Sequence, residues 1–220
     1  LPIKEIGELL KEHPAIFHID AVQAYGKVSI HPKELGVDLL TVSAHKFNGP
    51  KGVGFLYERE GIVLPPFIKG GEQEEKRRAG TENLPGIVGM AEAVKAFRHR
   101  KAGQEKMKEL SDYILNRLTA EKIAFSLNGD IENKIPQTMN LYFPHIHRDI
   151  LLTRLDLLGI ALSAGSACTA GIAEPSHVLS AMFGKDAPQV KASLRISLGY
   201  ENTLEEMALF CDKLIAELKR

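Results

Sequence analysis

The sequence contains no tryptophan, only two cysteines and no long hydrophobic run. Two cysteines are too few for a disulfide framework, and Cys168 and Cys211 lack the Cys-x-x-Cys spacing of zinc sites, so no metal is expected. No apolar stretch approaches the roughly 20 residues that span a bilayer. The first ten residues carry Lys4, Glu5 and Glu8 where a signal segment would be apolar. These absences predict a cytoplasmic protein without a membrane partner.

The sequence also has no excess of either charge. Its 28 lysines and arginines equal its 28 aspartates and glutamates, so it offers no basic field to attract nucleic acid or an anionic membrane. The 220 residues are 44% hydrophobic, which allows one large domain or two modest ones. We therefore expect a globular protein whose ligand is a small molecule.

Three short apolar runs mark the first half of the sequence, at residues 15–19, 37–42 and 53–57. The first run is followed by Asp20, and the second by Ser43, Ala44, His45 and Lys46. Nearly continuous apolar strands are typical of a sheet covered on both faces, in which ligands gather at the strand ends. The pattern predicts an α/β fold with a site at the ends of these strands.

The second half has the pattern of a smaller α+β domain. Strands are predicted at residues 125–127, 138–143 and 194–198. In this half, helices are predicted at residues 107–118, 149–158 and 176–183, and after Thr203, a favourable helix cap. In the first half, helices are predicted at residues 3–10 and from Pro85 onward. The charged segment 98–104 is the predicted junction between the two domains. A loop rich in Gly, Ala and Ser carries Cys168.

The residues after the first two strands include all the side-chain types that a pyridoxal phosphate (PLP) site needs. Such a site requires a carboxylate for the pyridine nitrogen, a lysine amine for the covalent bond, and hydroxyl or imidazole donors for the phosphate. Asp20 supplies the first, Lys46 the second, and Ser43 and His45 the third. Taken alone, Asp20 is more typical of a helix cap or turn residue, and Lys46 is more typical of an exposed loop lysine.

Five ordered motifs together are more specific. The sequence resembles the cysteine desulfurases, class V aminotransferases of the PLP-dependent fold type I, over essentially all 220 residues. The first motif combines His18-Ile19-Asp20-Ala21-Val22-Gln23 with residues 43–52, and the other four are residues 70–74, 77–81, 163–168 and 194–199. It implies that residues 1–98 are the carboxy-terminal part of a large, mostly parallel-sheet domain that binds PLP. Residues 99–220 would form a small α+β domain that carries the catalytic cysteine loop.

The resemblance implies a role for each residue of the cofactor site. Lys46 is expected to hold PLP covalently, Asp20 to pair with the pyridine nitrogen, and Gln23 to bond the ring hydroxyl. Ser43 and His45 are expected to bind the phosphate. In the family, the residue that matches Thr81 reaches the cofactor of the neighbouring subunit, so a homodimer is expected.

The resemblance also implies how the substrate is handled. Arg195 matches the arginine that binds the carboxylate of L-cysteine, and a planar guanidinium suits a bidentate bond to that group. Cys168 is expected to take the sulfur as a persulfide, with release of L-alanine. Its small neighbours favour the exposure and mobility that such a thiol needs. Cys211, on the apolar side of the last helix, is expected to be a core residue.

The loop around Cys168 resembles that of the long-loop desulfurases, which pass sulfur to iron-sulfur scaffold proteins or to tRNA thiolation enzymes. The alternatives are a selenocysteine lyase or an aminotransferase of the same fold, and a non-catalytic sulfur-transfer scaffold. A mobile thiol favours the desulfurase, because transamination does not need one. Family members carry roughly 150 further residues upstream, about one domain, so we expect this sequence to be a fragment of a complete enzyme.

Overall fold

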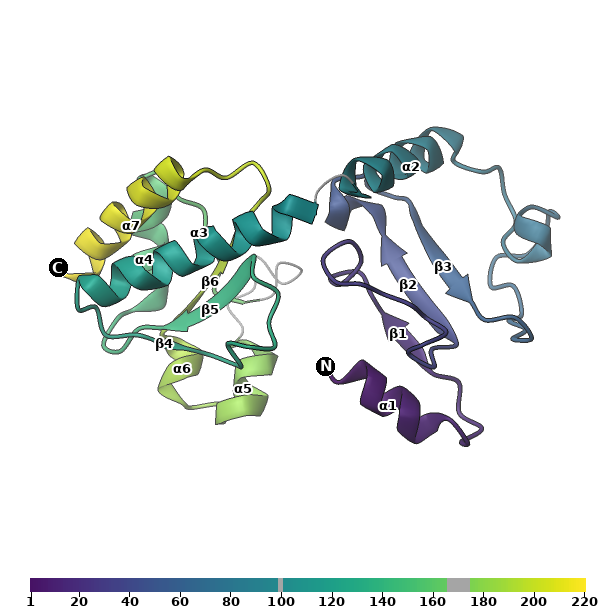
Figure 1. Cartoon of the computed structure of the whole chain (residues 1–220), viewed down its shortest axis with the longest axis horizontal. Coiled ribbons are helices and arrows are strands. Elements are labelled where there is room, and N and C mark those ends of the chain that lie inside the picture. Colours follow the sequence, from purple (N-terminus) through teal and green to yellow (C-terminus); the bar gives the residue numbers. More distant parts are fainter. Residues whose placement is uncertain (99–100, 166–174) are drawn as a thin grey trace. The chain divides into compact units, whose positions relative to one another are not determined.

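A computed structural model describes residues 1–98, 101–165 and 175–220. The chain divides into two compact units, residues 1–101 and 102–220, which are described separately (Figure 1). Among the described residues, no helix is both long and apolar enough to cross a membrane.

The first unit contains a three-stranded sheet in the order β1-β2-β3. Its strands are β1 (His18–Asp20), β2 (Leu39–Ser43) and β3 (Gly54–Glu58). β1 runs parallel to β2, and β3 runs antiparallel to it. All three strands were predicted, but β1 is shorter than the apolar run at residues 15–19. Just before β1, the Phe17 N–H donates to the carboxylate of Asp38 at 2.7 Å, and the Phe17 carbonyl accepts the backbone N–H groups of Asp38 and Leu39.

The two faces of this sheet differ. Leu40 and Val42 of β2 are buried in a core with Phe47, and the helix α2 (Leu84–Arg98) contributes Met90 and Val94 to it. On the other face Asp20 is exposed, and Leu56 of β3 is 45% exposed. Leu39 of β2 is buried on that same face. Within the described residues, the expectation of a sheet covered on both faces therefore holds fully for one face and only in part for the other.

Short helices complete the first unit. The predicted first helix is α1 (Ile3–Leu10), and Gly7 lets it approach the backbone of Leu35, because a Cβ at Gly7 would clash with the Leu35 carbonyl oxygen. Two 3-10 helices follow, η1 (Ala44–Phe47) directly after β2 and η2 (Glu74–Lys76). Asn48 ends η1 in the left-handed conformation, which asparagine tolerates better than most residues.

The second unit is built on an antiparallel sheet, β4-β5-β6. Its strands are β4 (Ser126–Leu127), β5 (Thr138–Tyr142) and β6 (Ser193–Ser197). The helices are α3 (Lys101–Ala120), α4 (Arg148–Leu157), α5 (His177–Phe183), α6 (Pro188–Lys191) and α7 (Leu204–Leu218). Every predicted strand and helix of this half is present. The four-residue α6 was not predicted, and the charged segment predicted as a junction is largely helical.

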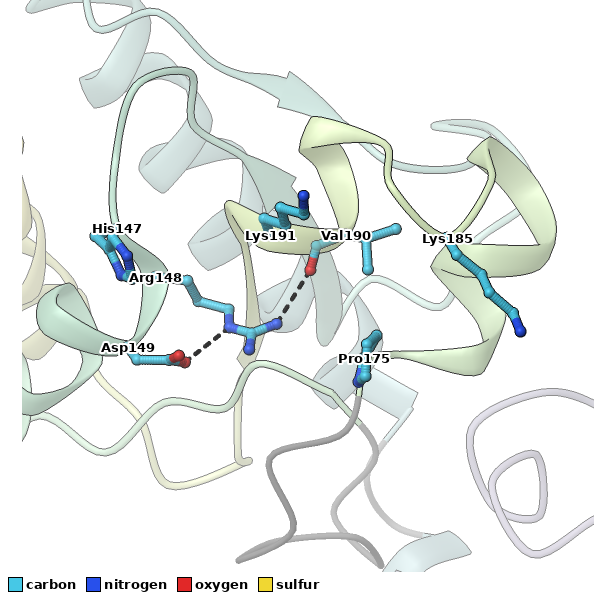
Figure 2. Close-up of a pocket in the computed structure, with 7 residues that line it drawn as sticks. All are labelled: His147, Arg148, Asp149, Pro175, Lys185, Val190 and Lys191. Carbon is cyan, nitrogen blue, oxygen red and sulfur yellow. Dashed lines mark hydrogen bonds and ion pairs between the residues drawn. The ribbon is translucent and has the colours of Figure 1, made fainter.

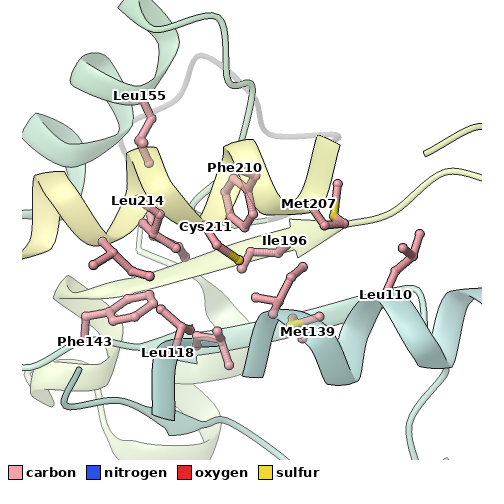
Figure 3. Packing of buried hydrophobic residues seen from close by; sticks show 14 of the residues in the cluster. Leu110, Leu118, Met139, Phe143, Leu155, Ile196, Met207, Phe210, Cys211 and Leu214 are labelled. Carbon is pink, nitrogen blue, oxygen red and sulfur yellow. The ribbon is translucent and has the colours of Figure 1, made fainter. Parts of the chain in front are cut away.

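The core of the second unit lies between the sheet and the helices α3, α4 and α7 (Figure 3). Leu118 of α3, Leu155 of α4 and Leu214 of α7 are fully buried there, and each buried leucine stabilises the fold by about 1.5–3 kcal/mol. The predicted cap of α7 is present as a capping box, in which Thr203 and Glu206 each accept a hydrogen bond from the other's backbone N–H.

Candidate functional site

The carboxyl ends of β1 and β2 bring the predicted cofactor residues to one edge of the sheet. Because the two strands are parallel and Asp20 pairs with Thr41, Asp20 ends its strand two positions before Ser43 ends the next. Thr41 and Ser43 point to the same face as Asp20, since alternate residues of a strand share a face. η1 then places His45 and Lys46 immediately beyond this edge.

Hydrogen bonds order this edge locally. The Ser43 Oγ and the His45 Nδ1 lie 2.8 Å apart, so the hydroxyl and the imidazole act as a pair. The Asp20 Oδ1 accepts the Val22 N–H at 2.8 Å, which is the turn role that the sequence left open. That contact turns the chain away from β1 and still leaves the carboxylate exposed. A carboxylate, a hydroxyl with an imidazole, and an amine therefore lie at the same edge of the sheet.

The turn after Asp20 carries Gln23 and adds a residue that the sequence did not indicate. The Lys27 Nζ donates to the Gln23 Oε1 at 3.0 Å. Burial, followed by the positive charge of Lys46, lowers the pKa of the Lys27 ammonium. Lys27 therefore lies near enough to Lys46 to interact with it electrostatically. No sequence pattern pointed to the contact between Lys27 and Gln23, because residues four apart meet reliably only in a helix.

Thr81 stands apart from this group. It is exposed in the segment between η2 and α2. Within the described part of the chain, no hydrogen bond or ion pair joins it to Asp20, Ser43 or Lys46. The structure therefore does not bring Thr81 together with the other predicted cofactor residues.

In the second unit, Arg195 lies on β6 beside the start of the predicted cysteine loop. The backbone N–H of Arg195 donates to the Ser163 carbonyl at 2.7 Å, and the backbone N–H of Ser163 donates to the Arg195 carbonyl at 3.4 Å. The Arg195 Nε is buried and has no hydrogen-bond partner among the described residues. Because buried guanidinium N–H groups are normally paired, this donor is chemically suited to an anionic ligand.

Cys168, the predicted sulfur acceptor, lies outside the described residues. The structure describes the chain up to Gly165 and again from Pro175, after which the Ser176 hydroxyl caps α5 by accepting the Leu179 N–H. Cys211 is fully buried on the face of α7 that points to Ile196 (Figure 3). Burial raises the pKa of its thiol to about 11, so Cys211 is the core residue that was predicted.

Two hollows lie away from the strand edge. One, of about 320 Å³, is lined by Arg148, Lys185 and Lys191, but Figure 2 shows both lysine side chains pointing away from the guanidinium. Arg148 is itself bonded to Asp149 and to the Val190 carbonyl. The other, of about 560 Å³, is lined by residues that include Asp38, at the opposite end of β2 from Ser43. Neither hollow gathers the predicted site residues.

Comparison with known proteins identifies the family. The sequence pattern of the family described as aminotransferase class-V matches residues 1–210. The chain belongs to the class-V aminotransferases. A relative from Bacillus subtilis (strain 168), which bears the provisional name cysteine desulfurase IscS 1, is 50% identical over 220 residues, 100% of this chain and 58% of that protein. Cysteine desulfurase IscS of Dictyoglomus turgidum is 42% identical over 97% of this chain and 54% of its own length.

Solved structures of NifS-like proteins have a similar fold. A NifS-like protein aligns with a TM-score of 0.86 and 34% identity, over 99% of this chain and 57% of its own. A NifS-like protein from Rickettsia africae aligns with a TM-score of 0.85 and 31% identity, over 99% of this chain and 57% of its own. The fold is that of the PLP-dependent fold type I enzymes, and the chain spans little more than half the length of these relatives.

The residues at the strand edge fit the cofactor of this family. PLP presents a ring nitrogen that a carboxylate stabilises in its protonated form, an aldehyde that a lysine amine can bind, and a phosphate that accepts hydrogen bonds. Asp20, Lys46 and the Ser43–His45 pair supply one group for each. Donor chemistry and placement at one edge therefore agree with PLP.

Proposed function

We propose that this chain belongs to a cysteine desulfurase, which removes the sulfur of L-cysteine and releases L-alanine. The observation that carries the proposal is the placement of Asp20, Ser43, His45 and Lys46 at one edge of the sheet, in a chain whose relatives bear cysteine desulfurase names. One aligned structure is described as SspA in complex with cysteine, at 33% identity and a TM-score of 0.72 over 92% of this chain and 55% of its own. That ligand supports the substrate class.

In this proposal the strand edge holds the cofactor. Lys46 binds it covalently, Asp20 pairs with its ring nitrogen, and Gln23 bonds its ring oxygen. Ser43 and His45 bind the phosphate, which their hydrogen-bonded pairing prepares them to do together. When bound, PLP supplies an electron sink for the charge left at the α carbon of the substrate.

The chain's own residues then divide the remaining work. Arg195 binds the carboxylate of L-cysteine, which would satisfy its unpaired Nε, and the Lys46 Nζ takes the proton from the α carbon. The Cys168 thiolate attacks the sulfur of the substrate, so that an S–S bond forms and the bond between that sulfur and its carbon breaks. The three-carbon remainder takes up protons and leaves as L-alanine. The balance needs no external oxidant or reductant, because the sulfur stays on Cys168 as a persulfide.

The wider setting of the protein is part of the same proposal. Residues 1–98 and 99–220 correspond to part of the large domain and to the small domain of the family. The complete protein is a cytoplasmic homodimer in which Thr81 serves the cofactor of the partner subunit. Its sulfur acceptor is an iron-sulfur scaffold protein or a tRNA thiolation enzyme.

The decisive experiment locates the transferred sulfur. The complete protein that contains this chain is exposed briefly to L-cysteine and digested, and the peptide containing Cys168 should gain the mass of one sulfur while L-alanine appears. Cys168→Ser should keep the cofactor and form neither product, because a hydroxyl is a far poorer nucleophile toward sulfur. Cys211→Ser is the matched control and should keep its turnover, since its thiol is buried.

Two results would contradict the proposal. If the extra sulfur appears on Cys211, the buried thiol is the acceptor and the loop has another role. If alanine release persists in Cys168→Ser, the protein is a lyase that uses external thiols or acts on selenocysteine.

A further inference from the structure

The contact between Lys27 and Gln23 limits what the Gln23 amide can offer to a ligand. A glutamine amide carries one acceptor oxygen and one NH₂ donor group, and it can turn over to exchange them. Because the Gln23 Oε1 accepts from the Lys27 ammonium at 3.0 Å, the Nε2 group is directed elsewhere. The ammonium has no acceptor function, so it cannot pair with the amide in the reverse orientation.

Aromatic packing holds the turn that carries Lys27. The Tyr25 ring lies between Phe47, at 5.1 Å between ring centroids, and Phe55, at 5.3 Å. Phe47 is the residue directly after Lys46, so the turn is anchored to the same short helix that carries Lys46. Gly26 has a φ of 77°, which lets the chain double back and brings Lys27 toward Gln23.

The surroundings of Lys27 differ from those of a surface lysine. Its side chain is partly buried, and its pKa is lowered by this burial and then by the charge of Lys46. An ammonium in such a place favours a negative charge nearby. An amide that presents its NH₂ group favours a negatively charged oxygen in the same way, because it can only donate to it.

We propose that Lys27 is a positioning residue that fixes the Gln23 amide with its NH₂ group toward the ring oxygen of the cofactor, and thereby selects the deprotonated form of that oxygen. The proposal rests on the proposed function, in which Gln23 bonds the ring oxygen. It adds that Lys27, which need not touch the cofactor, decides whether Gln23 acts as a donor or as an acceptor.

The test compares cofactor binding in variants of the complete protein, prepared without cofactor and titrated with PLP. Lys27→Met removes the ammonium and keeps the length of the side chain, so the amide can turn over. It should weaken PLP affinity by about tenfold or more, the range of one hydrogen bond to a charged group, and should shift the visible absorption maximum of bound PLP. Lys27→Arg keeps a charged donor and should restore both. Lys33→Met, which removes an exposed lysine of the same unit, is the matched control and should change neither.

A second background shows whether Lys27 acts through Gln23. Gln23→Ala should weaken PLP affinity and shift the absorption to a similar degree, and Lys27→Met added to it should have no further effect. Equal affinity and spectrum of Lys27→Met and the unaltered protein, or additive losses in the double variant, would overturn the inference. If Lys27→Met does not fold, as judged by thermal unfolding without cofactor, Lys27→Gln replaces it. Failure of the unaltered protein to bind PLP would instead overturn the proposed function.

Discussion

At the scale of single residues, Lys46 and Lys51 are the two lysines that follow β2, and only their surroundings distinguish them. Lys46 is partly buried in η1, and its positive charge lowers the pKa of Lys27, whereas Lys51 is exposed in the next turn. In the complete protein, Lys46→Ala should therefore abolish borohydride-reducible PLP and alanine release. Lys51→Ala is the matched control and should retain both. A reducible adduct that persists in Lys46→Ala would transfer the covalent role to another lysine.

At the scale of secondary-structure elements, Asp38 joins the strands of the first unit. Its two carboxylate oxygens accept the Phe17 N–H at 2.7 Å and the Arg59 Nε at 2.6 Å. Phe17 precedes β1 and Arg59 follows β3, so one side chain at the start of β2 holds all three strands. The backbone N–H of Phe17, and then Arg59, hold the pKa of the Asp38 carboxyl below its usual range, although burial opposes them.

The Asp38 contacts predict a local, pH-dependent loss of stability. Asp38→Ala leaves the Phe17 N–H without its acceptor, which costs about 1–3 kcal/mol. Amide hydrogen exchange in a peptide containing Phe17 should therefore be roughly tenfold faster or more than in the unaltered protein at pH 7. Because the folded pKa is lowered, the stabilisation is complete above the unfolded pKa, about 3.9, and is lost as the pH falls through the folded pKa. The ratio of the two rates should approach one in acid.

The control for this prediction is Asp186→Ala, which removes an exposed carboxylate from the second unit. It should leave exchange at Phe17 unchanged at every pH. A ratio of exchange rates for Asp38→Ala that stays constant into acid would show that the charge of Asp38 does not contribute to its contacts with Phe17 and Arg59.

At the scale of the whole molecule, the proposed homodimer predicts that Thr81 serves the cofactor of the partner subunit. In a dimer of one Lys46→Ala subunit and one Thr81→Ala subunit, the site that keeps Lys46 faces an intact partner Thr81. In a dimer of an unaltered subunit and a subunit with both substitutions, the site that keeps Lys46 faces a partner subunit without Thr81. The second dimer should bind PLP roughly threefold to tenfold more weakly, the range of one hydrogen bond. If Thr81 serves its own subunit, the order of the two affinities reverses.

Much of the architecture follows from local patterns in the sequence. The helix of Met107, Ile114 and Leu118 and the burial of Cys211 were predicted because a packed helix repeats its apolar residues every three to four positions. The strand-edge group was predicted because parallel strands end at the same edge, so Asp20 and Ser43 must lie near each other. The helix α6 was not predicted, because its four residues are too few to show a helical repeat of apolar positions.

Only the tertiary structure decided which residues far apart in the sequence contact each other. Asp38 contacts Phe17 and Arg59, each 21 residues away. The backbone of Ser163 pairs with that of Arg195, although α5 and α6 lie between them in the sequence. Periodicity records which face of an element is buried and carries no information about its polar partners. The Lys27–Gln23 contact depends likewise on the Tyr25 ring, which packs between two phenylalanines 22 and 30 residues further along. The sequence by itself determined the elements and the chemistry at their ends, and packing decided how those polar groups are held.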